Sequence, residues 1–121
     1  MKLQNIKFKA KRLDGKGWAI GDLLHSYENG TIIVPIEGGG AFSVDPDTIC
    51  QYTGLKDKEG MDIFEGDLLA EKRFPMYEVG YVDSEFAASY IGENIFIFKL
   101  PALSKDCVVC GSIYDRKEGE K

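Results

Sequence analysis

The chain has 121 residues, of which 44% are hydrophobic and 29% are charged, and its formal net charge is −5. That length is typical of one domain, and the composition excludes a disordered protein, which needs less hydrophobicity and more charge. The negative balance argues against a protein that binds nucleic acid over its whole surface. We therefore expect one domain over residues 1–121, with residues 115–121 as a charged and frayed tail.

Two further classes of protein are disfavoured. No stretch approaches the roughly 18 apolar residues of a membrane span, and the first twelve residues lack the apolar segment of a secretion signal. The three cysteines, Cys50, Cys107 and Cys110, are odd in number, which argues against a disulfide framework. We expect reduced thiols in a cytoplasmic protein that makes no membrane contact.

The chain opens with an alternation of apolar and basic side chains at residues 6–11. Period two predicts a half-buried strand with Lys7, Lys9 and Lys11 on its outer face, and a turn at residues 14–17 makes it the first strand of a hairpin. Residues 1–16 carry six basic residues against Asp14 alone, a net charge of +5 that leaves −10 for the rest of the chain.

Two interpretations of this basic strand stay open. Lysines on an edge strand discourage pairing with another chain, and this is the interpretation we favour. Alternatively, Lys7, Lys9, Lys11 and Arg12 contact nucleic acid, with neighbouring aromatic side chains to stack on bases.

The following elements are separated by turn residues. An Asn-Gly pair precedes a β-branched run at residues 31–34, and Pro46 lies in a turn between residues 42–44 and 48–52. Strands are also predicted at 79–82, 95–100 and 107–114, the last with a bulge at Gly111. Residues 84–91 fit a strand or two turns of helix, and pairing with residues 95–100 favours the strand.

Strand signals therefore recur every 8–14 residues, with turns between them. This spacing predicts a mostly-β protein: a small barrel, an SH3-like one being an example, or a sandwich, with at most one short helix at residues 84–91.

The polar motifs that suggest metal or redox chemistry are incomplete. Cys107 and Cys110 form a single C-x-x-C pair on a predicted strand, whereas a zinc site needs four ligands and a redox pair favours a helix N-terminus. The single histidine, His25, has no triad partner in an identifiable motif. The glycines at 38–40 match no phosphate-binding loop. We expect no cofactor and no metal.

Carboxylates are dense between residues 45 and 67, which suggests calcium binding or a hydrolase. In a calcium loop starting at Asp57, however, the fifth and twelfth ligand positions fall on Met61 and Leu68, so the pattern fails. No second catalytic group is identifiable. Turn formation and solubility are the interpretation we favour, and we expect no enzymatic activity.

A longer motif lies at the centre of the chain. It consists of residues 51–60 and 63–68, and its distinguishing members are Gln51, Tyr52, Thr53, Gly54, Gly60, Glu65, Gly66 and Asp67. This motif closely resembles the central motif of the YopX family, small proteins found mostly in phages and prophages. The basic opening at residues 6–12 and the closing strand at 108–115 are also similar to the family's, although Ser112 stands where asparagine is common.

The resemblance covers nearly the whole chain. It implies a mostly-β fold and oligomers, and it supplies no activity and no catalytic residues; a link to phage DNA packaging has been suggested for such proteins. The residues themselves favour a structural role, because Gly60 and Gly66 suit tight bends and Asp67 can accept hydrogen bonds from nearby amides.

The strand predicted at residues 95–100 is apolar on both faces, through Ile95, Phe96, Ile97 and Phe98. Such a strand must be covered twice, and a domain of this size has one core. We expect its second cover to be another subunit, unless residues 30–47 fold back over it. The leading hypothesis is thus a non-enzymatic phage or prophage accessory protein that forms a homo-oligomer and contacts other phage or host proteins. A nucleic-acid-binding module that uses the basic hairpin is the alternative.

Overall fold

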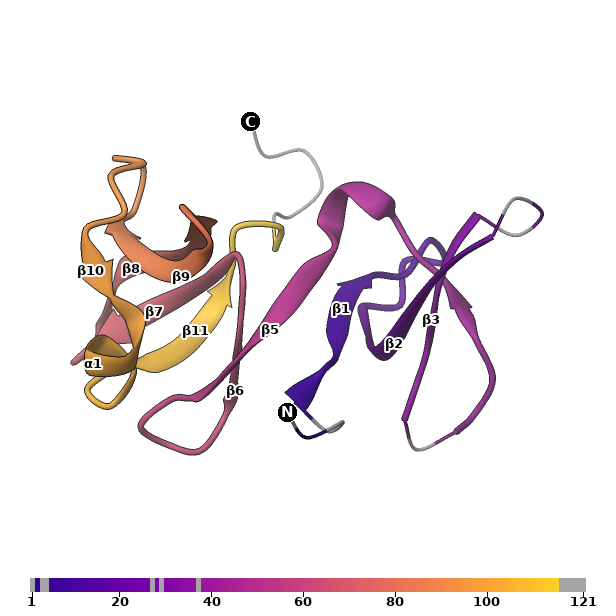
Figure 1. Cartoon of the computed structure of the whole chain (residues 1–121), viewed down its shortest axis with the longest axis horizontal. Coiled ribbons are helices and arrows are strands. Elements are labelled where there is room, and N and C mark those ends of the chain that lie inside the picture. The colour runs from indigo at the N-terminus through magenta and orange to yellow at the C-terminus, as the bar shows by residue number, and fades with distance from the viewer. Residues whose placement is uncertain (1, 3–4, 27, 29, 37, 116–121) are drawn as a thin grey trace. The chain divides into compact units, whose positions relative to one another are not determined.

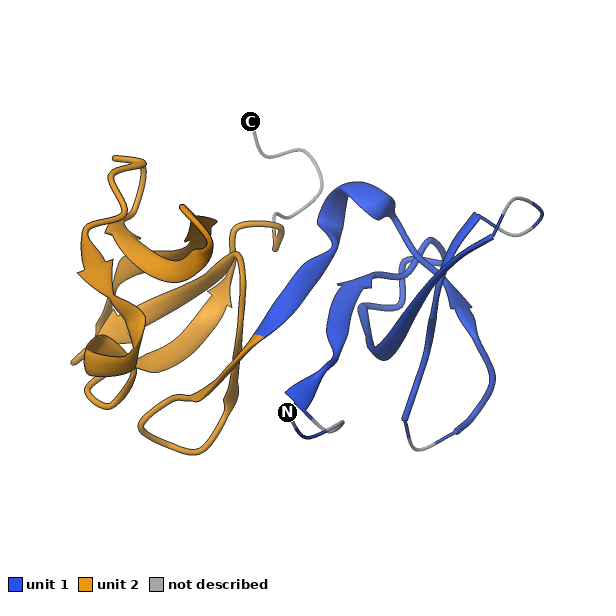
Figure 2. Cartoon of the chain, in the orientation of Figure 1, with its two compact units in different colours: residues 1–52 blue, residues 53–121 orange. Residues whose placement is uncertain are grey.

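Nearly all regular structure in the chain is β-strand (Figure 1). The computed structural model describes residues 2, 5–26, 28, 30–36 and 38–115. These residues separate into two compact units, 1–52 and 53–121 (Figure 2), each with a hydrophobic core. The described residues of the first unit form β1 (Phe8–Lys11), β2 (Trp18–Ser26), β3 (Gly30–Val34), β4 (Phe42–Ser43) and a 3-10 turn, η2 (Pro46–Thr48).

Strand β5 (Cys50–Lys56) runs from the first unit into the second. The second unit continues with β6 (Asp62–Phe64), β7 (Asp67–Glu71), β8 (Phe74–Val82), β9 (Glu85–Tyr90), β10 (Phe98–Lys99), the helix α1 (Leu100–Ser104) and β11 (Val108–Ser112).

The strands form two open antiparallel sheets, in the orders β4-β3-β2-β1-β5-β6 and β10-β9-β8-β7-β11. The prediction of a mostly-β fold is confirmed, and since both sheets end in edge strands, the described residues form no closed barrel. Among these residues, no helix has the length and apolarity needed to cross a lipid bilayer.

In the first unit, the predicted hairpins are present. Lys11 pairs with Trp18 at the β1–β2 turn, and Ser26 pairs with Gly30 where β2 meets β3. Tyr27 and Asn29 of that second turn, and Glu37 of the predicted glycine loop, lie outside the described residues. The core of this unit gathers small and branched side chains, which are Ala10, Ala19, Ile33 and Val44.

Within residues 30–47, Ile33 and Val44 are fully buried in the core of the first unit. The alternative that this segment covers residues 95–100 stays a prediction. The 45–47 turn is confirmed: the Asp45 carboxylate accepts the N–H of Asp47 at 2.9 Å and so begins η2. The expected single domain stays a prediction, as does the frayed tail, of which residues 116–121 lie outside the described residues.

In the second unit, seven buried residues form the core: Ile63, Leu69, Tyr77, Val79, Ala88, Leu100 and Cys107. The favoured strand at residues 84–91 is confirmed as β9, and the predicted bulge is present, since the pairing of β11 with β7 shifts between Val109 and Gly111.

Two details of the prediction for this unit are wrong. The short helix lies at Leu100–Ser104, where Pro101 in the first turn suits helix initiation, and not at 84–91. The strand expected over residues 95–100 is reduced to Phe98–Lys99. The reason is a tight turn in which the N–H of Ile97 donates to the carbonyl of Ile95 at 3.1 Å.

Candidate interaction surface

The central motif builds a frame of hairpins in the second unit. Gly54, Gly60 and Gly66 all have positive φ, of 85°, 85° and 84°, which side chains disfavour. Asp67 is fully buried, and its carboxylate accepts the N–H of Phe64 at 2.8 Å across the β6–β7 turn. The bends expected from Gly60, Gly66 and Asp67 are therefore present, and the structural role of the motif stays a prediction.

Other motif residues are placed along β5 and beside it. The hydroxyl of Thr53 donates to the carbonyl of Ile63 at 2.7 Å and so ties β5 to β6. Tyr52 is buried, Gln51 is exposed opposite Phe8, and Glu65 is half-buried in the β6–β7 turn.

Asp57 was singled out in the sequence only as one carboxylate of a cluster, but its contacts reach farthest. It is 7% exposed, and one carboxylate oxygen accepts N–H groups of Glu59 and Met61, both at 2.8 Å. The other oxygen accepts the N–H of Val109 on β11, also at 2.8 Å. Asp57 thus holds the outer edge of β11 to the β5–β6 turn.

Three other carboxylates of residues 45–67 make local contacts. Asp45 holds η2, Asp67 holds the β6–β7 turn, and Asp62 pairs with Lys56 at 2.6 Å. In the part of the chain that the structure describes, no three His, Cys, Asp or Glu side chains are arranged to hold a metal ion.

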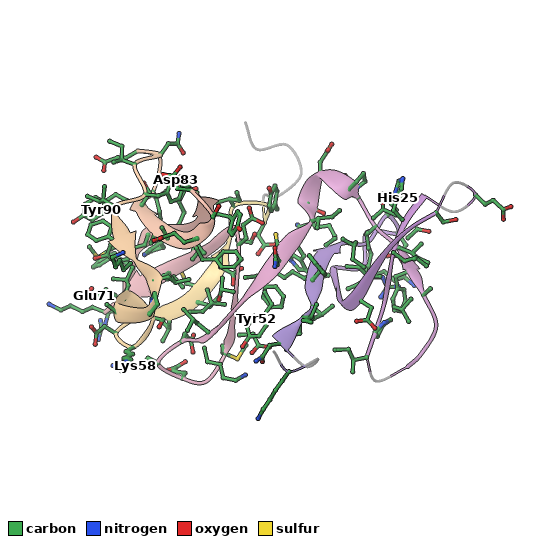
Figure 3. All side chains as sticks on the ribbon, in the orientation of Figure 1. His25, Tyr52, Lys58, Glu71, Asp83 and Tyr90 are labelled. Atoms are coloured by element: carbon green, nitrogen blue, oxygen red, sulfur yellow. The ribbon has the colours of Figure 1, made fainter. Side chains whose placement is uncertain are left out.

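His25 lies on β2 (Figure 3), where its Nδ1 is 3.2 Å from the hydroxyl of Thr31. The cysteines of the C-x-x-C pair differ in surroundings, because Cys107 is buried and Cys110 is exposed. Burial, with smaller effects from Glu71, Asp106 and Cys110, raises the pKa of the Cys107 thiol to about 11. Such a thiol is a poor nucleophile near neutral pH.

The basic residues of β1 lie over aromatic rings. The ammonium groups of Lys9 and Lys11 are 4.6 Å and 5.5 Å from the centroid of Trp18, and that of Lys7 is 4.6 Å from Tyr52. These are cation–π distances, and all three lysines are half-buried.

Arg12, which follows these lysines, contacts both a carboxylate and an aromatic ring. Its guanidinium donates to the carboxylate of Asp14 at 2.5 Å, and its Cζ lies 4.1 Å from the Phe42 ring centroid. This hydrogen bond, followed by one from the N–H of Lys16, lowers the pKa of Asp14.

The segment of residues 95–98 divides into two packed and two exposed side chains. The ring of Phe98 packs on the core, with centroids 5.3 Å from Tyr77 and 5.0 Å from Tyr90. Phe96 lies against Gly80, so tightly that a Cβ there would be 2.5 Å from its ring. Ile95 and Ile97, by contrast, are 59% and 70% exposed.

A hollow of about 430 Å³, which no sequence motif predicted, lies near the β10 edge. Its apolar lining comes from Leu55 on β5, Phe86 on β9 and Pro101 in α1. Glu85 and Lys99 also line it and form a loose ion pair, 3.9 Å apart and mostly exposed. Because three elements distant in sequence make this hollow, periodicity could not reveal it.

Comparison with protein families identifies the family of the chain. Residues 7–118 match the profile of the family described as YopX protein, and no curated protein matches the chain.

Proposed function

The chain belongs to the YopX family, and from this premise we propose that it is a phage or prophage accessory protein that acts through protein contacts, first of all with further copies of itself. It works in the cytoplasm of the host cell and catalyses no reaction. Contacts with another phage or host protein are the expected purpose of the assembly.

The observation that carries this proposal is the exposure of Ile95 and Ile97, at 59% and 70%, beside the short edge strand β10. Burying one isoleucine side chain stabilises an interface by about 1.5–3 kcal/mol. Ile97 lies two positions before Lys99, which lines the apolar hollow. Exposed apolar side chains that are close together are typical of a protein-binding surface.

The proposal that the protein catalyses no reaction is supported by the contacts of its buried carboxylates. The buried carboxylates of Asp57 and Asp67 accept backbone N–H groups, and they hold turns rather than face a common cleft. A general acid or base needs a partner group and room for a substrate.

A substitution at the exposed isoleucine tests the proposal. Ile97→Asp should yield a folded protein with a smaller mass in solution, because a charge there cannot be buried against another subunit. Leu13→Asp is the matched control, since Leu13 is 66% exposed and lies in the first unit. If Ile97→Asp keeps the wild-type mass, this surface is not the interface.

A nucleic-acid-binding module is the second candidate, and the spacing of Lys7, Lys9 and Lys11 along β1 favours it. Alternate positions in a strand share one face and are about 6.6 Å apart, a spacing suited to contacts with successive phosphates. The test is the binding of a labelled single-stranded oligonucleotide at about 50 mM and 200 mM salt. Binding that weakens with salt and is lost in Lys9→Glu supports this candidate, and salt-independent or absent binding removes it.

A further inference from the structure

The two turns at the ends of β8 carry opposite charges. At one end, Glu71 pairs with Phe74, so Lys72 and Arg73 form a two-residue turn. At the other end, Val82 pairs with Glu85, so Asp83 and Ser84 form the turn. Figure 3 shows Glu71 at the left side of the second unit and Asp83 near its top.

The basic turn has an unfavourable backbone conformation. Lys72 has a φ of 65°, in the left-handed region, where two-residue hairpins prefer Asn or Gly. A side chain such as lysine there costs roughly 1–2 kcal/mol. Retaining two cations in place of the preferred turn residues indicates that these charges serve a contact outside the hairpin.

Next to these cations is the most exposed large apolar side chain that the described residues contain. Phe74 is 73% exposed, and Pro75 beside it is also exposed. Residues 72–75, which we call the tip, therefore present an exposed aromatic ring next to two exposed basic side chains.

The opposite end of β8 has the complementary features. The apolar hollow of Leu55, Phe86 and Pro101 lies there, since Phe86 pairs with Tyr81 near the acidic turn. Its volume of about 430 Å³ exceeds that of one phenylalanine side chain. The carboxylate of Glu85 stands at its rim, where its ion pair with Lys99 is long, at 3.9 Å, and mostly exposed, so that an incoming cation can compete for it. Asp83 in the adjacent turn adds a second negative charge.

The tip and the hollow cannot meet within one chain. Phe74 and Tyr81 are seven positions apart on β8, which is roughly 24 Å along a strand. The geometry points to a second copy as the occupant: we propose that Phe74 of one chain inserts into the hollow of the next, with Lys72 and Arg73 facing Asp83 and Glu85. This inference rests on the proposed function and specifies its interface: Phe74 and the hollow form its centre, and Ile97, two positions before the hollow-lining Lys99, lies at its margin.

The proposed contact joins two different surfaces and is therefore head to tail. Such contacts repeat from chain to chain, and they give a ring if the rotation closes or a filament if it does not. The charges set the register of insertion, and the desolvated aromatic ring supplies most of the affinity.

Two variants of the full chain test the two sides of the contact, the tip and the hollow, one at a time. Phe74→Ser removes the inserted group, and Pro101→Arg places a bulky cation at the hollow, opposite Lys72 and Arg73. Met61→Ser is the control, because Met61 is 60% exposed in the β5–β6 turn and lines no part of the hollow. The mass is measured by light scattering over a range of concentrations, with circular dichroism to check folding.

We expect each of the two variants alone to be monomeric at concentrations where the wild type and Met61→Ser assemble, a weakening of about tenfold or more. Mixed in equal amounts, they should form a dimer and nothing larger, because one intact tip and one intact hollow remain. If Pro101→Arg is unfolded, Glu85→Lys takes its place.

The other outcomes identify what fails. If the wild type and Phe74→Ser assemble equally well, the proposed contact is wrong, and the proposed function is unaffected. Variants that are monomeric alone and fail to pair when mixed show that the contact is not head to tail, which also overturns the inference. A wild type that is monomeric throughout overturns both proposals.

Discussion

The carboxylate of Asp57 accepts the N–H of Val109 at 2.8 Å, across 52 positions of sequence. The same side chain organises its own turn through Glu59 and Met61. One buried residue thus joins the central hairpin to the last strand, which explains why the motif and the closing strand belong together in one unit.

Replacing Asp57 with alanine should lower the free energy of unfolding by about 2–4 kcal/mol, because three backbone N–H groups lose their acceptor. Urea unfolding followed by circular dichroism measures this. The control is Glu59→Ala, an exposed change in the same turn that should stay within about 0.5 kcal/mol of wild type. Equal losses for the two variants would show that the Val109 contact contributes little.

Gly66 is buried and has a φ of 84° in the β6–β7 turn. Gly66→Val should destabilise the protein by about 1–3 kcal/mol, because a branched side chain is strained at that φ. A melting temperature equal to that of the wild type would show that the turn relaxes into another conformation, against the structural role that we assign to the motif.

Gly80 leaves space for the ring of Phe96, and a Cβ would approach that ring to 2.5 Å. Gly80→Ala should therefore cost about 1–3 kcal/mol through displacement of the ring. In a double-mutant cycle, Phe96→Ala should remove most of this penalty, since the clash then has no second partner. Additive effects of the two substitutions would contradict the packing of Phe96 on Gly80.

The buried thiol of Cys107 makes stability depend on alkaline pH. Its pKa in the folded chain is about 11, above that of the unfolded chain, so the unfolded state releases its proton first as pH rises. Stability that is fully present below about pH 9 is lost progressively toward pH 11, by an amount on the order of 2 kcal/mol.

Cys107→Ala should lack this part of the alkaline loss. Burial, with smaller effects from Glu71, Tyr90 and Cys107, also raises the pKa of Tyr77, which acts in the same direction. The comparison of wild type with Cys107→Ala isolates the thiol, because Tyr77 is present in both. Parallel stability curves from pH 8 to pH 11 would contradict the assignment.

Much of the β architecture could be predicted from local sequence. Alternation in residues 6–11 gave β1, and the turn at residues 14–17 gave its hairpin, because side-chain period and turn residues act over a few positions. The bends at Gly60 and Gly66 were accessible for the same reason.

The features that could not be predicted depend on contacts between residues distant in sequence. Residues 95–100 have the composition of a strand, but the ring of Phe96 packs on Gly80 and bends the chain there. The hollow between Leu55, Phe86 and Pro101 depends on elements that meet only after folding. The exposure of Phe74 also could not be predicted, since a large aromatic side chain is more often buried than exposed.

Self-association is the central claim of this account, and the mass of the wild-type chain in solution tests it most directly. Sedimentation equilibrium over a wide concentration range should give a mass that is a multiple of 13.5 kDa and falls on dilution. A single mass of 13.5 kDa at every concentration would contradict the claim.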